Sequence, residues 1–290
     1  MNRRLNLKAW LFMLPALSLL IAFTHWPTLK TFWRSATWAK SDVAPSQFVG
    51  LENYGLLIED PVFWKVIENN FWYALGTVPT SIALAIAMAL WVNGKIKHKG
   101  LLRLAYFTPT ILPMITVANI WLFFYSPDIG LFDQLLRAVG IDGPNWLGDP
   151  DTALGSLMAM TIWKEAGFFM IFYLAALQTL SPELYDAAKV EGAGPWRIFR
   201  RITFPLLMPT TLFVLINALL NAFKLVDHLF ILTKGGPNNA SNLLLYYIYE
   251  TAFSFLDSYY AATLTVVMLV ALALIALAQM LLFDRKIHYR

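Results

Sequence analysis

Long apolar runs without charged residues alternate with short polar segments along this chain. Five of these runs hold no charged residue, and a sixth, from Thr152 to Leu177, holds only Lys164 and Glu165. Each run reaches or exceeds the roughly 20 residues that a helix needs to cross about 30 Å of hydrocarbon. We therefore predict an all-α membrane protein with six transmembrane helices in one domain over residues 1–290. The predicted spans cover approximately residues 9–32, 69–93, 102–126, 152–177, 204–230 and 258–283.

Prolines lie inside several of these spans, among them Pro15, Pro79, Pro109 and Pro113. Each removes a helical hydrogen bond, because proline has no backbone N–H. A membrane helix tolerates this where a neighbouring helix or water satisfies the freed carbonyl group. The prolines therefore suggest kinked helices around a cavity.

Composition supports a chain whose solvent is the bilayer. Apolar residues make up 58% of the sequence and charged residues 14%, whereas roughly a quarter of the residues in a soluble domain are charged. Cysteine is absent, which excludes disulfides and thiolate ligands. The four histidines are scattered, and no His-Glu-x-x-His, Gly-x-Ser-x-Gly or phosphate-binding Gly-x-x-x-x-Gly-Lys-Ser/Thr motif occurs. These absences argue against an intramembrane enzyme, a metal site, a cofactor in this chain, and ATP hydrolysis by the chain itself.

Basic residues concentrate in alternate loops, and the loop after the third span is acidic instead. The positive-inside rule places the basic loops and both termini in the cytoplasm. The loop after the first span is weaker evidence, because its lysines and arginines offset its acids. The basic segments hold Arg3, Arg4 and Lys8; Lys95, Lys97, Lys99 and Arg103; Lys189, Arg197, Arg200 and Arg201; and Arg285, Lys286 and Arg290.

A polar, basic segment over residues 181–204 separates the fourth span from the fifth. Ser181-Pro182-Glu183 predicts a helix start, with a capping hydroxyl, proline at the first helical position and an acid in the first turn. Gly192-Ala193-Gly194 predicts its end, since glycine reaches positive φ without a steric penalty. Ala187 and Ala188 are small enough to let another surface approach closely. From these residues alone, a docking helix and an amphipathic helix lying on lipid headgroups both remain open.

Four polar side chains of the fifth predicted span are spaced four, three and four residues apart, which places them on one helical face. Ionisable residues within a span cost about 2.5–3.5 kcal/mol each at mid-depth, so they normally face a cavity or a partner. Asp227 lies three residues after one of them and is spaced to neutralise its charge. We predict a substrate pathway; the alternative is that the ionisable members snorkel at the outer interface. The four are Asn217, Asn221, Lys224 and His228.

Lys164 and Glu165 lie near the middle of the fourth predicted span. Adjacent helical residues do not face the same way, so each side chain needs a partner of its own. A polar pathway residue and an interhelical ion pair are the two interpretations of this pair.

Three motifs occur in order along the chain. Residues 48–54 read F-V-G-L-E-N-Y. The 181–204 segment carries Asp186-Ala187-Ala188, then Gly192, and runs into I-T-F-P at Ile202–Pro205. Residues 233–237 read T-K-G-G-P, and Leu244, Tyr247, Ile248, Tyr249, Ala252 and Phe253 follow them.

With these motifs the chain resembles the permease subunits of binding-protein-dependent ABC importers, in particular the carbohydrate-uptake branch. The cytoplasmic loop of these permeases usually reads E-A-A, then G, then I-x-L-P. The resemblance covers nearly the whole chain and implies a type I ABC importer permease fold in a bacterial inner membrane. Asp186 departs from the usual glutamate and shortens the acid by one methylene, which leaves the geometry of any ion pair with an ATPase arginine open.

The resemblance also implies partners and sites. The partners are a second homologous permease, two cytoplasmic ATPase subunits that hold ATP and magnesium, an extracytoplasmic solute-binding protein and membrane lipid, with no nucleic acid. The residues implied in ATPase coupling are Tyr185, Asp186, Ala187, Ala188, Glu191, Gly192 and Ala193. Those implied in binding-protein contact are Gly235, Gly236 and Pro237, for which a plain turn is the alternative.

We therefore interpret the chain as a transport subunit for a sugar, a sugar derivative or a polyol. Lys164, Lys224 and His228 leave an anionic substrate open, either phosphorylated or sulfonated. The rival interpretation is an ion-coupled secondary transporter, since polar stripes and broken helices suit that class too. Co-purification with an ATPase separates the two.

Overall fold

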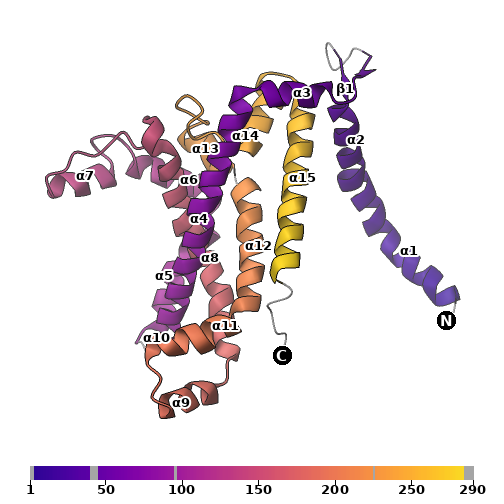
Figure 1. Ribbon diagram of the computed structural model, residues 1–290. Coiled ribbons are helices and arrows are strands. Elements are labelled where there is room, and N and C mark those ends of the chain that lie inside the picture. Colours follow the sequence, from indigo (N-terminus) through magenta and orange to yellow (C-terminus); the bar gives the residue numbers. More distant parts are fainter. Residues whose placement is uncertain (1–2, 40–44, 95–96, 225, 284–290) are drawn as a thin grey trace. The chain divides into compact units, whose positions relative to one another are not determined.

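The computed structural model describes residues 3–39, 45–94, 97–224 and 226–283, and most of them are helical (Figure 1). Within these ranges the strands form one short antiparallel pair, with Thr37 opposite Phe48. The elements, in chain order, are α1 (Arg3–Leu20), the π-helical turn η1 (Ile21–His25), α2 (Trp26–Ser35), β1 (Thr37–Trp38), β2 (Gln47–Phe48), α3 (Glu52–Glu59), α4 (Pro61–Asn93), α5 (Lys99–Ile111), α6 (Met114–Phe124), α7 (Leu131–Ala138), α8 (Pro150–Thr179), α9 (Pro182–Val190), α10 (Pro195–Ile198), η2 (Phe199–Thr203), α11 (Phe204–Leu206), α12 (Met208–Lys224), α13 (Asp227–Leu232), α14 (Leu244–Tyr249), η3 (Glu250–Ser254) and α15 (Ser258–Phe283).

The described helices confirm an all-α membrane protein. Five are long and apolar enough to cross a bilayer, and the bent pair α5 and α6 makes a sixth span when it is counted as one. The five cover Trp10–Ser35, Pro61–Asn93, Pro150–Thr179, Met208–Leu232 and Ser258–Gln279. The two chain ends that we predict in the cytoplasm lie outside the described residues, at 1–2 and 284–290.

The chain divides into two compact units. The first joins Met1–Phe63 with Ile248–Ala271, and the second joins Trp64–Tyr247 with Leu272–Arg290. Each unit is described by itself below. The single domain over residues 1–290 remains a prediction.

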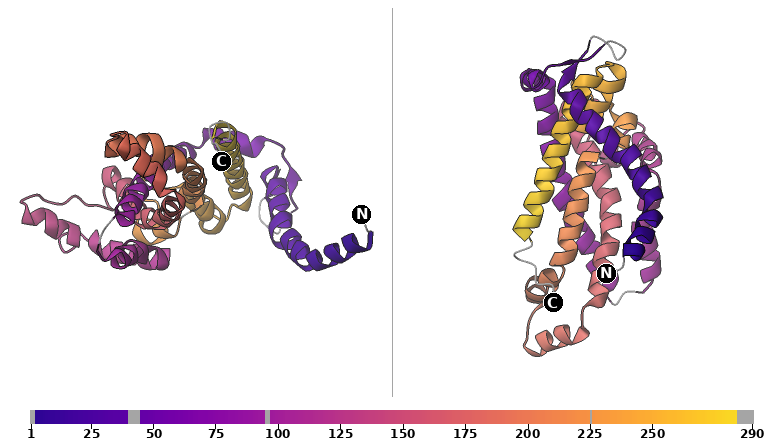
Figure 2. Two further views of the ribbon diagram at one scale, coloured as in Figure 1. Left: turned by 90° about the horizontal axis from the view of Figure 1, so that it is seen from below. Right: turned by 90° about the vertical axis from the view of Figure 1, so that its right-hand side faces the viewer.

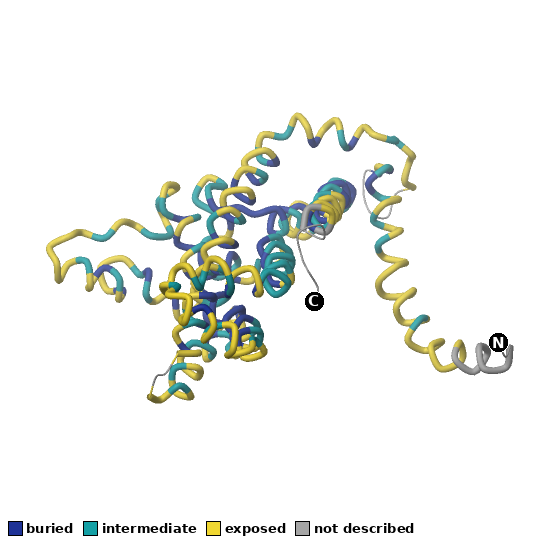
Figure 3. Tube along the Cα trace, turned by 60° about the horizontal axis from the view of Figure 1, so that its bottom comes forward, coloured by how far each residue is buried: buried dark blue, intermediate teal, exposed yellow. Residues whose placement is uncertain are grey.

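In the first unit, the apolar helix from Trp10 to Ser35 is exposed along most of its length, as the tube of α1 in Figure 3 shows. Phe12 and Phe23 are 86% and 77% exposed. A helix that is apolar all round and unburied by its own chain needs lipid or another protein as its surroundings.

The motif at residues 48–54 fixes the end of α2. Asn53 is buried, and its side-chain amide donates to the carbonyl oxygens of Ser35 (3.0 Å) and Thr37 (2.9 Å). The Tyr54 hydroxyl donates to the Ser35 hydroxyl at 2.9 Å. The last carbonyl groups of a helix have no partner within it. The motif therefore satisfies the end of the first span, which explains its position directly after that span.

In the second unit, α8 packs against α5, α12 and α13. Figure 2 shows α8 and α12 side by side. The largest buried side chains of α8 are at most 1% exposed, because neighbouring helices cover it on several sides. They include Leu157, Met160, Phe169 and Tyr173.

Candidate functional site

The loop between α8 and α12 begins with the helix α9, which is capped at both ends. The Ser181 hydroxyl accepts from the backbone N–H of Glu183 at 3.2 Å. At the other end Gly192 has φ +73°, and the N–H of Ala193 donates to the carbonyl of Ala188 at 2.9 Å. This six-to-one bond, with a glycine in the left-handed region just before it, is the Schellman arrangement. Helix start and stop therefore follow from the residue types that predicted them.

Figure 1 shows α9 beyond the end of α8 and beside α10, at the opposite end of this unit from α13. Tyr185 and Ala188 face the chain: Ala188 is buried, and the Tyr185 hydroxyl lies 3.3 Å from Thr203 Oγ1. These two side chains hold the helix in place. The remaining predicted coupling residues are exposed or half-buried and gather on α9 and its cap: Asp186, Ala187, Glu191, Gly192 and Ala193.

Lys164 forms hydrogen bonds at the bend between α5 and α6, the two halves of the third span. Its ammonium donates to the carbonyl oxygens of Pro109 (2.9 Å) and Leu112 (2.6 Å). Pro113 has no N–H, so the carbonyl of Pro109 loses the donor that a regular helix would give it four residues later. The chain turns by 101° between α5 and α6 at this point. Lys164 therefore replaces a missing backbone donor, an arrangement that neither sequence interpretation anticipated.

Glu165 faces a different neighbour, as expected for an adjacent residue. Its Oε2 accepts from the side-chain amide of Asn221 on α12 at 2.8 Å. The two residues border a cavity of about 10 Å³, which is at the lower limit for holding one water molecule. The other polar residues of this cavity are Thr77, Ser81 and Thr161.

His228 lies in the interior of the second unit. It is fully buried, and its Nε2 lies 3.0 Å from the hydroxyl of Tyr73. That hydroxyl also lies 2.7 Å from Thr161 Oγ1. Tyr73 and Thr161 thus join α4, α8 and α13 in one buried hydrogen-bond network that the sequence interpretation missed.

The single helical face predicted for Asn217, Asn221, Lys224 and His228 does not extend to His228, since only the first three lie in α12. Helix α12 ends at Lys224 and α13 begins at Asp227, so the regular spacing stops between them. Lys224 and Asp227 are both exposed, and no ion pair joins them among the described residues. The Asn217 amide donates to the carbonyl of Phe213 in its own helix at 2.8 Å. The structure therefore brings together Asn221 and Glu165 but not the whole predicted set.

A second signal along α4 was available in the sequence. Four polar residues recur at every fourth position of an otherwise apolar helix, which places them along one face. All four are at most 3% exposed. They run from the loop at residues 233–242 at one end to the cavity beside Glu165 at the other: Asn69, Tyr73, Thr77 and Ser81.

The loop at residues 233–242 contains the predicted binding-protein contact. Gly235 is buried with φ +79°, and Gly236 and Pro237 are half-buried. The Ser241 hydroxyl donates to the carbonyl oxygen of Gly236 at 2.5 Å and lies 2.8 Å from Thr233 Oγ1. The loop is therefore folded upon itself by its own side chains.

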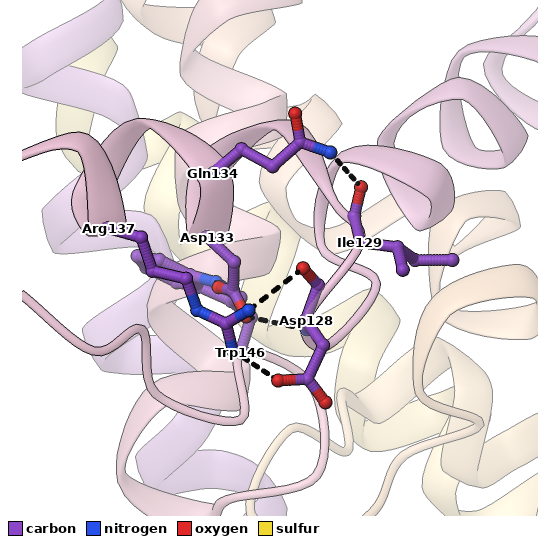
Figure 4. A network of polar contacts seen from close by, with 6 residues as sticks. All are labelled: Asp128, Ile129, Asp133, Gln134, Arg137 and Trp146. Atoms are coloured by element: carbon purple, nitrogen blue, oxygen red, sulfur yellow. Dashed lines mark hydrogen bonds and ion pairs between the residues drawn. The ribbon is translucent and has the colours of Figure 1, made fainter.

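The acidic segment between α6 and α8 is organised around Asp133, whose neighbourhood Figure 4 shows. The buried carboxylate accepts from Trp146 Nε1 at 2.7 Å and from the N–H of Asp128 at 2.9 Å. Arg137 pairs with the carboxylate of Asp128. The bond from Trp146, followed by the bond from Asp128, lowers the pKa of Asp133 below its ordinary value.

Replacing Asp133 with asparagine is expected to lower the thermal unfolding midpoint at neutral pH and to remove a pH dependence. A carboxyl whose pKa is lowered by folding stabilises the protein above its unfolded pKa, about 3.9, and loses this contribution as pH falls through the folded value. The gap in Tm between wild type and Asp133→Asn should therefore persist between about pH 5 and 7 and close below about pH 4. The exposed Asp142→Asn is the control, and a constant gap across this range contradicts the prediction.

Comparison with known proteins shows which family the chain resembles in sequence and fold. Residues 81–289 match the family model described as "Binding-protein-dependent transport system inner membrane component". The probable ABC transporter permease protein YurN of Bacillus subtilis is 33% identical over 279 residues, covering 94% of this chain and 95% of that protein. The lactose transport system permease protein LacF of Rhizobium radiobacter is 32% identical, covering 96% of this chain and 95% of the relative.

The sulfoquinovosyl glycerol transport system permease protein SmoG of Agrobacterium fabrum is 33% identical over 91% of this chain and 86% of its own length. A solved bacterial ABC transporter for import of the acidic polysaccharide alginate has a chain that matches with a TM-score of 0.85. That match has 23% identity and covers 97% of this chain and 96% of the other. This match shows that the two chains share the same fold. With a family model over most of its length and relatives above 30% identity, this multi-pass inner-membrane chain is a permease subunit and belongs to the binding-protein-dependent transport system inner membrane components.

Proposed function

We propose that this permease carries a sugar, a sugar derivative or a polyol into the cytoplasm, using ATP that is hydrolysed on separate subunits docked at α9. The single observation that carries the proposal is the capped helix α9, with Asp186, Ala187 and Glu191 exposed together in a chain of this family. The relatives named for lactose and for sulfoquinovosyl glycerol support a carbohydrate substrate. The name of the second relative, the sulfoquinovosyl glycerol permease, also supports an anionic, sulfonated substrate.

Movement at α9 reaches the polar interior through the long helices that precede and follow this loop, α8 and α12. Along the chain, α9 follows α8 and precedes α12, and these two helices hold Glu165 and Asn221. A displacement of α9 by an ATPase subunit therefore acts on the hydrogen bond between these two residues. Asp186 is bonded to Lys189 within α9 at 2.9 Å through Oδ1, so its other carboxylate oxygen can accept from an arginine of the partner.

The proposed orientation puts α9 and both chain ends in the cytoplasm and the 233–242 loop outside. A solute-binding protein docks on this loop around Gly235, Gly236 and Pro237, and a second homologous permease completes the pathway. ATP and magnesium belong to the ATPase subunits. This assignment differs from an ion-coupled secondary transporter, which needs neither a docking helix nor a binding protein.

Replacing Ala187 with tryptophan is expected to reduce ATP-driven uptake more than tenfold while leaving the permease folded. Ala187 is exposed, so the larger side chain disturbs a docking surface rather than the interior. Two measurements check this result: the amount of ATPase that co-purifies with the permease, and uptake by proteoliposomes with ATP inside.

The matched control is Ala138→Trp on α7, another exposed helical alanine. It is expected to keep both the bound ATPase and the uptake. Normal uptake by Ala187→Trp, or uptake by the wild-type protein that depends on an ion gradient without ATP, contradicts the proposed function.

A further inference from the structure

The outer loop at residues 233–242 is joined to α4 through one buried side chain. Asn69 is 2% exposed, and its side-chain amide donates to two carbonyl oxygens of the loop, Asn239 at 2.7 Å and Asn242 at 2.9 Å. These bonds connect residues 170 and 173 positions apart in the sequence. A buried amide with two carbonyl acceptors holds a loop strongly, because its loss leaves the carbonyl of Asn242, a residue that is 1% exposed, without this donor.

The backbone of the loop is irregular, although it has hydrogen bonds of its own such as Ala240 N–H to the Pro237 carbonyl at 2.8 Å. Lys234, Asn238 and Asn239 all have positive φ, at 50°, 48° and 59°. This backbone region is sparsely populated by residues other than glycine, and it persists where the surroundings determine it. Asn242, only 1% exposed, adds a side-chain bond to Asn239 Oδ1 at 3.0 Å. One of the two carbonyl groups that Asn69 holds thus belongs to Asn239, a residue with positive φ, and the other belongs to the buried Asn242.

Asn69 is also the first member of the polar stripe on α4, which consists of Asn69, Tyr73, Thr77 and Ser81. Tyr73, one turn further, bonds to Thr161 and His228. Thr77 and Ser81 then border the cavity beside Glu165. Helix α4, which contains Pro79, therefore connects the loop with the polar interior.

We propose that Asn69 is a positioning residue that holds the 233–242 loop against α4, so that a binding protein docked on the loop acts on this helix and on the polar residues along it. The inference rests on the proposed function for the identity of the docking partner. The attachment of the loop does not depend on that identity.

Hydrogen exchange on the purified full-length permease tests the attachment. Asn69→Ala is expected to raise exchange of the backbone amides in residues 233–242 by about tenfold or more, because local opening of the loop no longer breaks two side-chain bonds. Asn70→Ala is the matched control: Asn70 is equally buried on the same helix, but its amide bonds to Val66 in its own helix at 2.9 Å. Unchanged loop exchange in Asn69→Ala overturns the proposal.

A second variant distinguishes the loss of the hydrogen bonds from the cavity that the smaller alanine side chain leaves. Asn69→Asp keeps the size of the side chain but places a carboxylate against two carbonyl oxygens, so it should release the loop as well. Loop exchange at the wild-type rate in Asn69→Asp also overturns the proposal.

The consequence for docking is measured on the assembled complex in proteoliposomes, with the binding protein that stimulates ATP hydrolysis by the wild type. Asn69→Ala is expected to raise the binding-protein concentration for half-maximal stimulation about tenfold and to keep the maximal rate within about twofold. A variant that merely damages the fold lowers the maximal rate instead. An unchanged half-maximal concentration overturns the role in docking. If no binding protein stimulates the wild-type complex, the proposed function fails, while hydrogen exchange still decides whether Asn69 holds the loop.

Discussion

Replacing Lys164 with methionine is expected to destabilise the permease by about 2–4 kcal/mol. The ammonium donates to the carbonyl oxygens of Pro109 and Leu112, where the third span bends by 101°. Methionine keeps the length and packing of the side chain but leaves both carbonyl groups without a donor. Each unsatisfied carbonyl costs about 1–3 kcal/mol, and the half-buried position of Lys164 favours the lower part of this range.

Thermal unfolding of the detergent-solubilised protein measures this effect. The matched control is Lys189→Met on α9, whose ammonium is exposed and paired with Asp186 three residues away. Exposed pairs of this kind contribute about 0–1 kcal/mol, so the control should unfold near the wild-type temperature. Equal unfolding temperatures for Lys164→Met and Lys189→Met would show that the bend does not depend on the lysine.

The membrane spans could be predicted from the sequence because the length of an apolar run is a local property. The run from Ser258 to Phe283 coincides with α15, and the run around Thr152 lies within α8. The ends of α9 could also be predicted from the sequence. A serine before a proline and a glycine after the last turn act on the nearest backbone groups, so their consequences do not depend on distant residues.

The polar contacts inside the membrane could not be derived in this way, because they depend on which helices meet. Proline spacing predicted a kink in the third span, but only the packing of α5 against α8 shows that Lys164 satisfies it. The face expected over residues 217–228 assumed a regular helix, and the helix ends at Lys224. His228 then turns to Tyr73 on α4, a contact between residues 155 positions apart.

The stripe on α4 is an intermediate case. Asn69, Tyr73, Thr77 and Ser81 recur every fourth position, so the sequence contained the pattern. Its meaning came from the partners at its two ends, the loop carbonyls and the cavity beside Glu165. A regular polar pattern inside an apolar helix therefore predicts a buried polar face but does not identify what lies against it.

Replacing Gly167 with alanine is expected to destabilise the permease by at least about 2 kcal/mol, whereas the same change at Gly155 in the same helix should be neutral or stabilising by up to about 1 kcal/mol. A β-carbon on Gly167 would overlap the carbonyl oxygen of Tyr106, which is backbone and cannot rotate away. Gly155 has open space where its β-carbon would lie. Inside a helix alanine is otherwise more favourable than glycine. The two substitutions therefore differ only in whether α5 lies against the substituted residue. Gly167 is three residues from Lys164 and meets the same helix, so a forced separation of α5 from α8 also pulls Pro109 away from the ammonium. Unfolding temperatures of the two variants in the same detergent measure the difference, and a stable Gly167→Ala protein would contradict the close approach of these helices.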